Sequence, residues 1–505
     1  MTDLANHGNK VIAKGAFINI LGALGKGLIP VYFILITRMY GPETMGLFYI
    51  VYVMVDMAVS LTVSGLNDGV IMFTSRFVAF KEKERETYDI IANGFVISLA
   101  ISVLIIILAY FGGPQLILMK YSDKNVIKAV QSVVWSIPFV IIPVIVVSAT
   151  KSHLTMKWDA ILLGFLRSFV LIVFSVAFYF TGAGLFGLIW AYNISAVVIT
   201  LISIIIFGRY FSYSKLFKAV FSFKISLPLV KFSIPQNLNM TFNTFITNVD
   251  VVMLGFFGVA PEIIAFYGMG SQIVRAIRQI KLAFSGSYAP IIARLYGQGE
   301  IEKVNFSFSM VSRWTTMISF PVALIVIMFK NELLRLFHPS FTSDTSFMLL
   351  LLAPPLLSCM VGMAGNIIVM TGNSLWNLIN SMTIAVVNAY LNWLFIPHWG
   401  IMGAASATLI ASLLVSSMQL VEAYYLTGAR LIISKIYKPY LAIIIPVLLL
   451  TILSYSVSVE MFAAKLAVAV ILVFLYIALL IGMKFEPEDR ELFAKKGFFK
   501  RKAHE

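Results

Sequence analysis

The chain has little of the chemistry on which soluble proteins, disulfide-linked proteins and many enzymes depend. Charged residues make up only 12% of its 505 residues, which excludes an ordinary soluble domain. The single cysteine, Cys359, excludes an intrachain disulfide. Its five histidines are scattered over predicted loops and termini, and no glycine-rich phosphate loop with a lysine is present. We therefore expect no metal site, no ATPase site and no cofactor.

What the chain has in abundance is apolar sequence. Hydrophobic residues make up 60% of it, the mean hydropathy is +0.93, and apolar runs of membrane-spanning length recur from end to end. This predicts an all-α, polytopic membrane protein with about fourteen transmembrane helices. The expected spans are residues 14–37, 44–67, 88–111, 126–149, 159–180, 184–207, 228–256, 263–289, 306–329, 345–370, 376–396, 400–425, 439–457 and 461–482.

Basic residues predict the orientation of these spans. The chain has 38 Lys and Arg against 23 Asp and Glu, and most of the basic residues fall in alternate loops and in the C-terminal tail. By the positive-inside rule, those loops and both termini lie in the cytoplasm. The net charge of +15 is therefore expected to face a membrane surface, with no nucleic acid as partner. This predicts a multi-pass protein of the cell (inner) membrane whose first span is an uncleaved signal anchor.

The two halves of the chain resemble each other weakly. Segments 42–48 and 261–267, residues Arg76 and Arg294, and segments 184–187 and 400–403 form three pairs at nearly one spacing. Six spans per repeat predict two parallel lobes related by an axis along the membrane normal. The expected domains are an N-lobe (1–207), a basic cytoplasmic linker (208–227), a C-lobe (228–425), a C-terminal helix pair (426–482) and a basic tail (483–505).

The predicted span 263–289 carries the clearest functional signal. It holds Arg275, Arg278 and Lys281 and no acidic residue. On a helix these three cations fall within an arc of about 120°, together with Gln272. A charge near the bilayer centre costs at least ~2.5 kcal/mol, so we expect the cations to face a wet cavity and to bind an anion. The alternative is an amphipathic helix that lies on the cytoplasmic face of the membrane.

Isolated charges in other spans are further candidates. Lys26 lies in the first predicted span and Asp56 in the second, and the repeat places Asp56 opposite Arg275. Either cation is a candidate partner for Asp56, in a structural salt bridge or at a site for a coupling ion, H⁺ or Na⁺. Arg167 is a weaker candidate, and Arg313 lies close enough to the end of its span to extend to the interface.

The seventh predicted span has a row of polar side chains on one face. Its members, the polar stripe, are Gln236, Asn239, Asn243, Thr247 and Asp250. So many polar groups are unsuited to lipid, so we expect Asn239 and Asn243 to line a cavity and to bind sugar hydroxyls or water. Interhelical hydrogen bonding is the alternative. Asp250, near the outer end, is expected to be a charge partner, a coupling site or an interfacial charge.

Several short segments resemble bacterial polysaccharide flippases of the multidrug/oligosaccharidyl-lipid/polysaccharide exporter superfamily. Residues 38–48 (RMYGPETMGLF) are similar to the first periplasmic turn of that family. The second half of the family is matched by residues 248–255 (NVDVVMLG), 371–373 (TGN) and 396–405. The resemblance covers about residues 10–425. It implies two six-helix lobes, alternating access, and Arg275 and Lys26 as cavity cations.

The resemblance also implies a substrate, which is an undecaprenyl-diphosphate-linked oligosaccharide flipped from the cytoplasmic to the outer leaflet. Lipid II flippases add two C-terminal helices that form a groove for the lipid tail, as spans 439–457 and 461–482 are placed to do. A polysaccharide polymerase and glycosyltransferases are the expected partners. The alternatives are a multidrug/cation antiporter, which favours an acidic cavity, and a lipid II flippase, whose first-span arginine pattern is missing here. We expect no enzymatic activity, because the loops hold no evident set of catalytic acids.

Overall fold

The computed structural model describes residues 2–63, 65–78, 80–111, 124–153, 157–342, 344–456, 462–483 and 486. Within these ranges it describes the backbone alone for residues 2–27, 81, 124–126, 286, 287, 290 and 454–456. The predicted site residue Lys26 therefore lies outside the described side chains.

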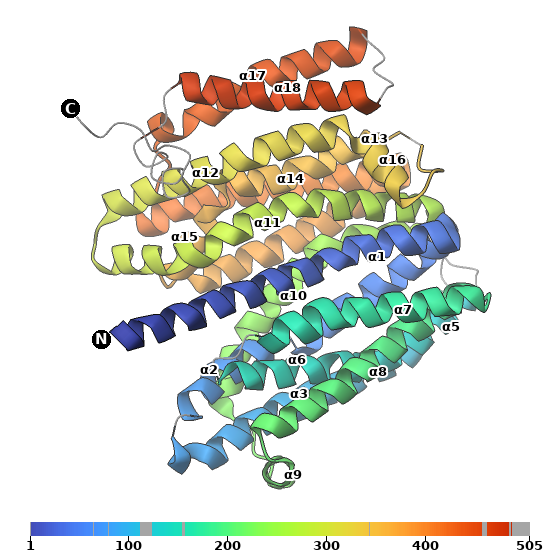
Figure 1. Cartoon of the computed structure of the whole chain (residues 1–505), viewed down its shortest axis with the longest axis vertical. Helices are drawn as coiled ribbons and strands as arrows, with labels where there is room; N and C mark the ends of the chain where they lie inside the picture. The colour runs from blue at the N-terminus through green and yellow to red at the C-terminus, as the bar shows by residue number, and fades with distance from the viewer. Residues whose placement is uncertain are drawn as a thin grey trace. The chain divides into compact units, whose positions relative to one another are not determined.

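The described residues form helices joined by short turns, and they contain no β-strand (Figure 1). The α-helices are α1 (Thr2–Val63), α2 (Leu66–Phe77), α3 (Glu84–Phe111), α5 (Lys124–Val133), α6 (Ile137–Lys151), α7 (Arg167–Phe180), α8 (Gly184–Tyr210), α9 (Tyr213–Phe221), α10 (Leu227–Phe256), α11 (Pro261–Gly297), α12 (Ile301–Met328), α13 (Lys330–Phe337), α14 (Phe347–Val361), α15 (Met363–Met370), α16 (Ser374–Thr427), α17 (Ile433–Ser456) and α18 (Phe462–Gly482). Two 3₁₀ turns, η1 (Lys81–Lys83) and η2 (Val134–Ser136), and a π-helix, η3 (Asp159–Leu166), complete the order. The predicted all-α fold is confirmed.

Two of the helices are long because each contains two predicted spans. The helix α1 is broken at Gly41 (φ 83°) and α16 at Gly400 (φ 53°). Both angles lie in the left-handed region, which glycine adopts far more easily than residues with a Cβ. The break at Gly41 falls in the predicted turn between spans 14–37 and 44–67, and the break at Gly400 falls on the first residue of the predicted span 400–425. The chain therefore reverses within a residue of where the sequence indicates.

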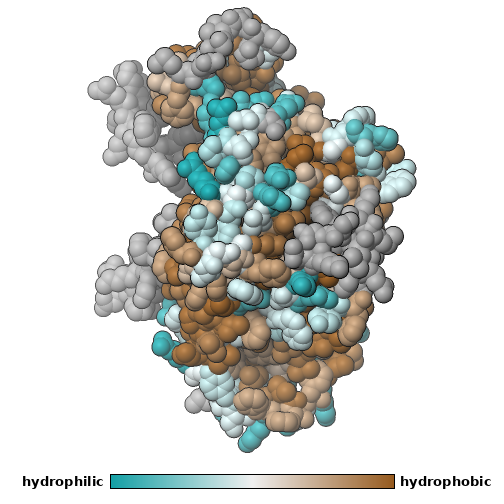
Figure 2. Space-filling view, turned by 90° about the vertical axis from the view of Figure 1, so that its right-hand side faces the viewer, coloured by the Kyte–Doolittle hydropathy of each residue, from teal (hydrophilic) through white to brown (hydrophobic). Residues whose placement is uncertain are grey.

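Most of the long helices have the hydropathy of membrane spans, and two of them, α10 and α11, do not. Among the described residues, nine helices are long and apolar enough to cross a membrane, or ten if α14 and α15, which meet at a 49° bend, are counted as one span. Helices α10 and α11 do not belong to this set, although they occupy predicted spans. They are the two that carry the polar stripe and the cations. Large exposed apolar side chains cover much of the face drawn in Figure 2, as expected where lipid replaces water.

The chain divides into two compact units. Unit 1 comprises residues 1–269, 336–341 and 381–407. Its helices pack as α1 on α10 and η3, α7 on α8, and α3 on α2, α6 and α9. One of its cores is built from α2, α3, α6 and α8 and includes Val70, Ile91, Ala149 and Phe207.

Unit 2 comprises residues 270–335, 342–380 and 408–505. In it α12 packs on α14, α17 and α18, and α17 and α18 form a side-by-side pair (Figure 1). Its larger core includes Ile292, Phe308 and Ile367. The lobe boundaries expected from the sequence repeat stay a prediction.

Candidate functional site

The three cations of α11, the cationic stripe Arg275, Arg278 and Lys281, lie together in unit 2. Arg278 is exposed, and Arg275 and Lys281 are half-buried. Val274 and Ile277 are buried, and at 100° per residue they lie next to Lys281 on the helix surface. The stripe therefore runs from the exposed Arg278 to Lys281 at the edge of the buried side of the helix.

The charges of the cationic stripe are close enough to act on one another. Arg275 and Arg278 repel each other, and so do Arg278 and Lys281. Repulsion between like charges raises the free energy of the unliganded protein, and an anion bound between them relieves it. The arrangement therefore suits a multiply charged anion.

Lys281 has a specific structural environment at the bend between α14 and α15. A Cβ atom built on Gly362, in that bend, would lie 2.6 Å from the Lys281 Nζ atom and 2.3 Å from the Ser358 carbonyl oxygen. The Ser285 hydroxyl donates a hydrogen bond of 3.0 Å to the Lys281 carbonyl. A glycine at position 362 thus leaves the space that the lysine amine occupies.

The polar stripe of α10 lies in unit 1, and some of its side-chain donors and acceptors make hydrogen bonds to other protein groups. Asn243 Nδ2 donates to the Asn239 carbonyl at 2.8 Å, and Ser381 Oγ of α16 donates to Asn239 Oδ1 at 2.8 Å. Asn243 is exposed and Asn239 half-buried, so both remain reachable. Interhelical hydrogen bonding, one of the two alternatives that the sequence leaves open, therefore occurs in the stripe, and cavity lining stays a prediction.

Asp250, at the end of the polar stripe, is the most buried acid of the candidate set, with 5% of its surface exposed. Its Oδ2 atom accepts a hydrogen bond of 2.7 Å from the Tyr267 hydroxyl, and its Oδ1 atom accepts one of 2.9 Å from Asn392 Nδ2. Asn392 in turn bonds Asn388. An exposed interfacial charge, one of the expectations for Asp250, is therefore wrong.

Asp56 is exposed on α1, and its neighbourhood in unit 1 differs from what the sequence suggests. Asn248 Nδ2 donates a hydrogen bond of 3.2 Å to Asp56 Oδ2. The charge of Arg167 also acts on Asp56, and Arg167 Nη2 donates to the Tyr192 hydroxyl at 3.1 Å. Arg167 follows directly on the π-helix η3, a geometry that recurs at functional sites. The pairing of Asp56 with Lys26 or Arg275 stays a prediction.

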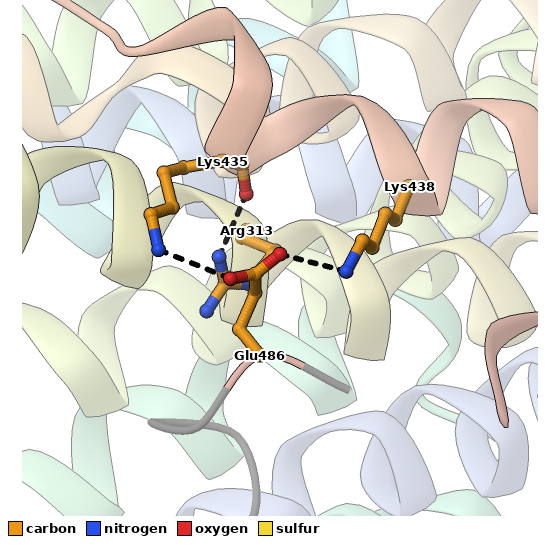
Figure 3. Close-up of polar contacts among 4 residues, drawn as sticks. All are labelled: Arg313, Lys435, Lys438 and Glu486. Carbon is orange, nitrogen blue, oxygen red and sulfur yellow. Dashed lines mark hydrogen bonds and ion pairs between the residues drawn. The ribbon is translucent and has the colours of Figure 1, made fainter. Parts of the chain in front are cut away.

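Arg313 of α12 is buried inside unit 2. Only 1% of its surface is exposed, and its Nη1 atom donates a hydrogen bond of 2.7 Å to the Lys435 carbonyl (Figure 3). The Glu486 carboxylate lies between Lys438 and Lys435, at 2.7 and 3.0 Å (Figure 3). Its guanidinium is buried where α12 meets the start of α17, and its extension to the membrane interface stays a prediction.

The sequence gave no role to Asn388 and Asn392, included Tyr267 as the last residue of the repeated segment 261–267, and gave little weight to Arg167. Asn388 and Asn392 are spaced i, i+4 in the second half of the predicted span 376–396, which places them on one helix face and was a usable signal. Tyr267 has no such signal, because a tyrosine near a span end is ordinary. Among the described residues, no group of three or more His, Cys, Asp or Glu is placed to hold a metal ion.

Two family models match parts of this chain. The polysaccharide biosynthesis protein family matches residues 12–296, and the MatE family matches residues 235–394. No curated protein sequence matches the chain.

Solved structures share the fold at low sequence identity. The lipid II flippase MurJ in an inward closed conformation has a TM-score of 0.70 and 15% identity, over 95% of this chain and 100% of that one. An inward-facing multidrug resistance MATE family transporter of the MOP superfamily has a TM-score of 0.67 and 16% identity, over 80% and 94%. A MOP superfamily transporter from Pyrococcus furiosus has a TM-score of 0.58 and 14% identity, over 82% and 94%.

These solved structures are those of transporters and of a flippase, and at 14–16% identity they share the fold of this chain. The family match covers more than half of the chain, and the fold agrees with it over nearly the whole length. The chain belongs to the polysaccharide biosynthesis protein family.

Proposed function

We propose that the protein is a flippase that moves a polyprenyl-diphosphate-linked oligosaccharide from the cytoplasmic to the outer leaflet by alternating access, for surface polysaccharide export. The observation that carries this proposal is the cationic stripe. Three mutually repelling cations lie on one side of α11, with Arg278 exposed, in a member of the polysaccharide biosynthesis protein family.

The physical demand on such a protein is to shield the diphosphate. That group carries about two to three negative charges, and an unshielded charge in hydrocarbon is far more costly than the burial of one paired side chain. Arginine donates two parallel hydrogen bonds to a phosphate, and lysine adds a point charge. The membrane potential then assists, since each negative charge that moves outward gains ~2.3 kcal/mol per 100 mV with the inside negative.

The remaining candidate residues fit the sugar and the coupling step. Gln272, Asn239 and Asn243 carry amide groups suited to hydroxyls. The buried carboxylate of Asp250, held by Tyr267 and Asn392, and the exposed carboxylate of Asp56 are the candidate sites for a coupling ion, H⁺ or Na⁺. Flipping in vesicles with an imposed H⁺ or Na⁺ gradient tests this role, and an equal rate without any gradient contradicts it.

Two alternatives remain within the same superfamily, a multidrug/cation antiporter and a lipid II flippase. A cationic drug favours an acidic site, whereas the cationic stripe of α11 offers three cations and no acid. The lipid II flippase matches 95% of this chain and the multidrug transporter 80%, which supports a lipid-linked substrate over a drug.

The proposal places the protein in the cell membrane with both termini in the cytoplasm, next to the polymerase and glycosyltransferases that handle the same glycan. A membrane-impermeant thiol reagent should label Thr342→Cys in intact cells and leave Lys83→Cys unlabelled. The reverse pattern contradicts this orientation.

The decisive experiment compares glycan export in cells that lack the native gene. A variant with Arg275→Ala, Arg278→Ala and Lys281→Ala should lose export by at least about 100-fold at equal membrane protein level, because several charge-assisted hydrogen bonds are lost. Arg294→Ala, an exposed cation at the end of the same helix, is the matched control and should export normally. Normal export by the triple variant would sink the proposal and favour an interfacial α11.

A further inference from the structure

The linker after α8 has a feature that the flippase proposal does not use. Residues 208–231 hold Arg209, Lys215, Lys218, Lys224 and Lys231 and no acidic residue. The middle of this segment folds into the short helix α9, which belongs to unit 1. In Figure 1, α9 is seen nearly end-on, whereas α3 and α8 run across the picture. Its axis therefore crosses the direction of the membrane-spanning helices of the same unit.

One side of α9 is fixed to α3. Ala219 is buried in the core that contains Tyr88 and Phe207, and Leu216 and Val220 pack against that core. The Tyr88 hydroxyl accepts a hydrogen bond of 2.8 Å from the Ser212 amide, just before the helix. After the helix, the Asn93 side chain of α3 makes two hydrogen bonds to the backbone of the linker. Its Nδ2 atom donates to the Lys224 carbonyl and its Oδ1 atom accepts from the Ser226 amide, each at 2.9 Å. The helix is thus held at both ends.

A second side of α9 is apolar and exposed. Tyr213, Phe217 and Phe221 are spaced i, i+4, i+8 and lie on one face, with 60% of Phe217 and 89% of Phe221 exposed. Ile225 and Leu227, which follow the helix, are also exposed. Aromatic side chains of this size are rarely presented to water in a group, so the face marks a contact with a partner.

The third side of α9 and its flanks are basic. Lys215 pairs with Glu84 of α3 at 2.6 Å, and the acids Glu86 and Asp89 lie further along the same helix. Around the apolar face, further cations are exposed, namely Arg209, Lys218, Lys224 and Lys231. A band of cations beside an apolar face complements an anionic lipid surface, in which phosphates lie beside acyl chains.

We propose that α9 is an in-plane membrane anchor, with Phe217 and Phe221 inserted among the lipids of the cytoplasmic leaflet and the flanking cations bound to anionic headgroups. The partner is the lipid surface, not a protein. The anchor holds the segment between the two predicted lobes at the depth of the headgroups. Because α3 is hydrogen-bonded to the chain at both ends of α9, the anchor also fixes the depth of unit 1 in the membrane. This inference requires only that the chain spans a membrane, and it stands or falls independently of the substrate.

The test uses nitroxide spin labels on the full chain in lipid vesicles. Cys359 is buried, so it is replaced by alanine, or retained as an unlabelled background if the alanine protein folds poorly. Labels at Phe217→Cys and Phe221→Cys should collide several-fold more often with oxygen than with a water-soluble nickel complex. A label at the matched position Ser222→Cys, on the basic side, should show the reverse. Equal nickel access at positions 217, 221 and 222 would overturn the proposal, and so would protection of 217 and 221 from both reagents, which indicates a protein contact.

A second arm tests the charges. Addition of phosphatidylglycerol to phosphatidylethanolamine vesicles should raise the oxygen-to-nickel ratio at position 217 about two-fold or more. A variant with Lys218→Gln and Lys224→Gln should lose this dependence on the anionic lipid. A ratio that does not respond to phosphatidylglycerol in the parent protein would refute the role of the anionic headgroups.

Discussion

Within unit 2, the arginines of α11 and α12 meet opposite environments. Arg313 of α12 is buried, donates to the Lys435 carbonyl, and lies beside the cluster in which Glu486 bridges Lys435 and Lys438 (Figure 3). Arg278 of α11 is exposed, and the charges that act on it are other cations. The first environment satisfies the cation inside the protein, and the second leaves it able to bind an external anion. A cation in a membrane helix therefore reveals its role through its partners, not through its position in the sequence.

The largest expected effect is a difference between the two arginines: Arg313 contributes to the stability of the fold, and Arg278 contributes to flipping. Arg313→Ala should lower the free energy of unfolding by about 3 kcal/mol, because a buried charged hydrogen bond is lost and a cavity is left. Arg278→Ala should change it by less than about 0.5 kcal/mol and yet reduce flipping by at least about ten-fold. Thermal unfolding in detergent and flipping of a fluorescent lipid-linked oligosaccharide measure the two quantities. Equal losses of stability in both variants would remove the distinction.

A smaller effect is expected from the glycine that makes room for Lys281. Gly362→Ala places a methyl group 2.6 Å from the Lys281 Nζ atom and 2.3 Å from the Ser358 carbonyl oxygen, so both the lysine and the bend between α14 and α15 must shift. We expect flipping to fall about three- to ten-fold, since one of the three cations is displaced but not removed. Gly297→Ala on α11 is the matched control, because no atom lies within 4 Å of its added Cβ. Unchanged flipping in Gly362→Ala would show that the position of Lys281 is not critical.

The smallest effect concerns the pH dependence of the stability that the ion pairs of Glu486 with Lys435 and Lys438 provide. Hydrogen bonds from Lys438 and Lys435 lower the pKa of Glu486 to about 2. A carboxylate whose pKa is lowered on folding stabilises the protein above its unfolded pKa of about 4.3 and loses that contribution as the pH falls toward 2. Glu486→Gln should therefore cost about 1–2 kcal/mol at pH 6, with allowance for screening by solvent, and progressively less toward pH 3. A difference in unfolding midpoint that does not shrink on acidification would contradict the assignment.

Much of the fold was predictable, because hydropathy and helix breaking are local properties. The spans follow from runs of apolar residues, and the reversals at Gly41 and Gly400 follow from residues that tolerate a positive φ. The stripe of α11 was also predictable, since residues 275, 278 and 281 share a helix face whatever the helix packs against.

The partners of the charged residues were not predictable in this way. Asp250 finds Asn392 across 142 residues of sequence, and Arg313 finds the Lys435 carbonyl across 122. The charge that acts on Asp56 is that of Arg167, to which the sequence gave little weight. Local periodicity places each side chain on a face of its own helix but does not set the rotation and height of the next helix. A hydrogen bond requires its atoms within about 3 Å, so only the packed tertiary structure decided which charges are satisfied inside the protein and which remain available to a ligand.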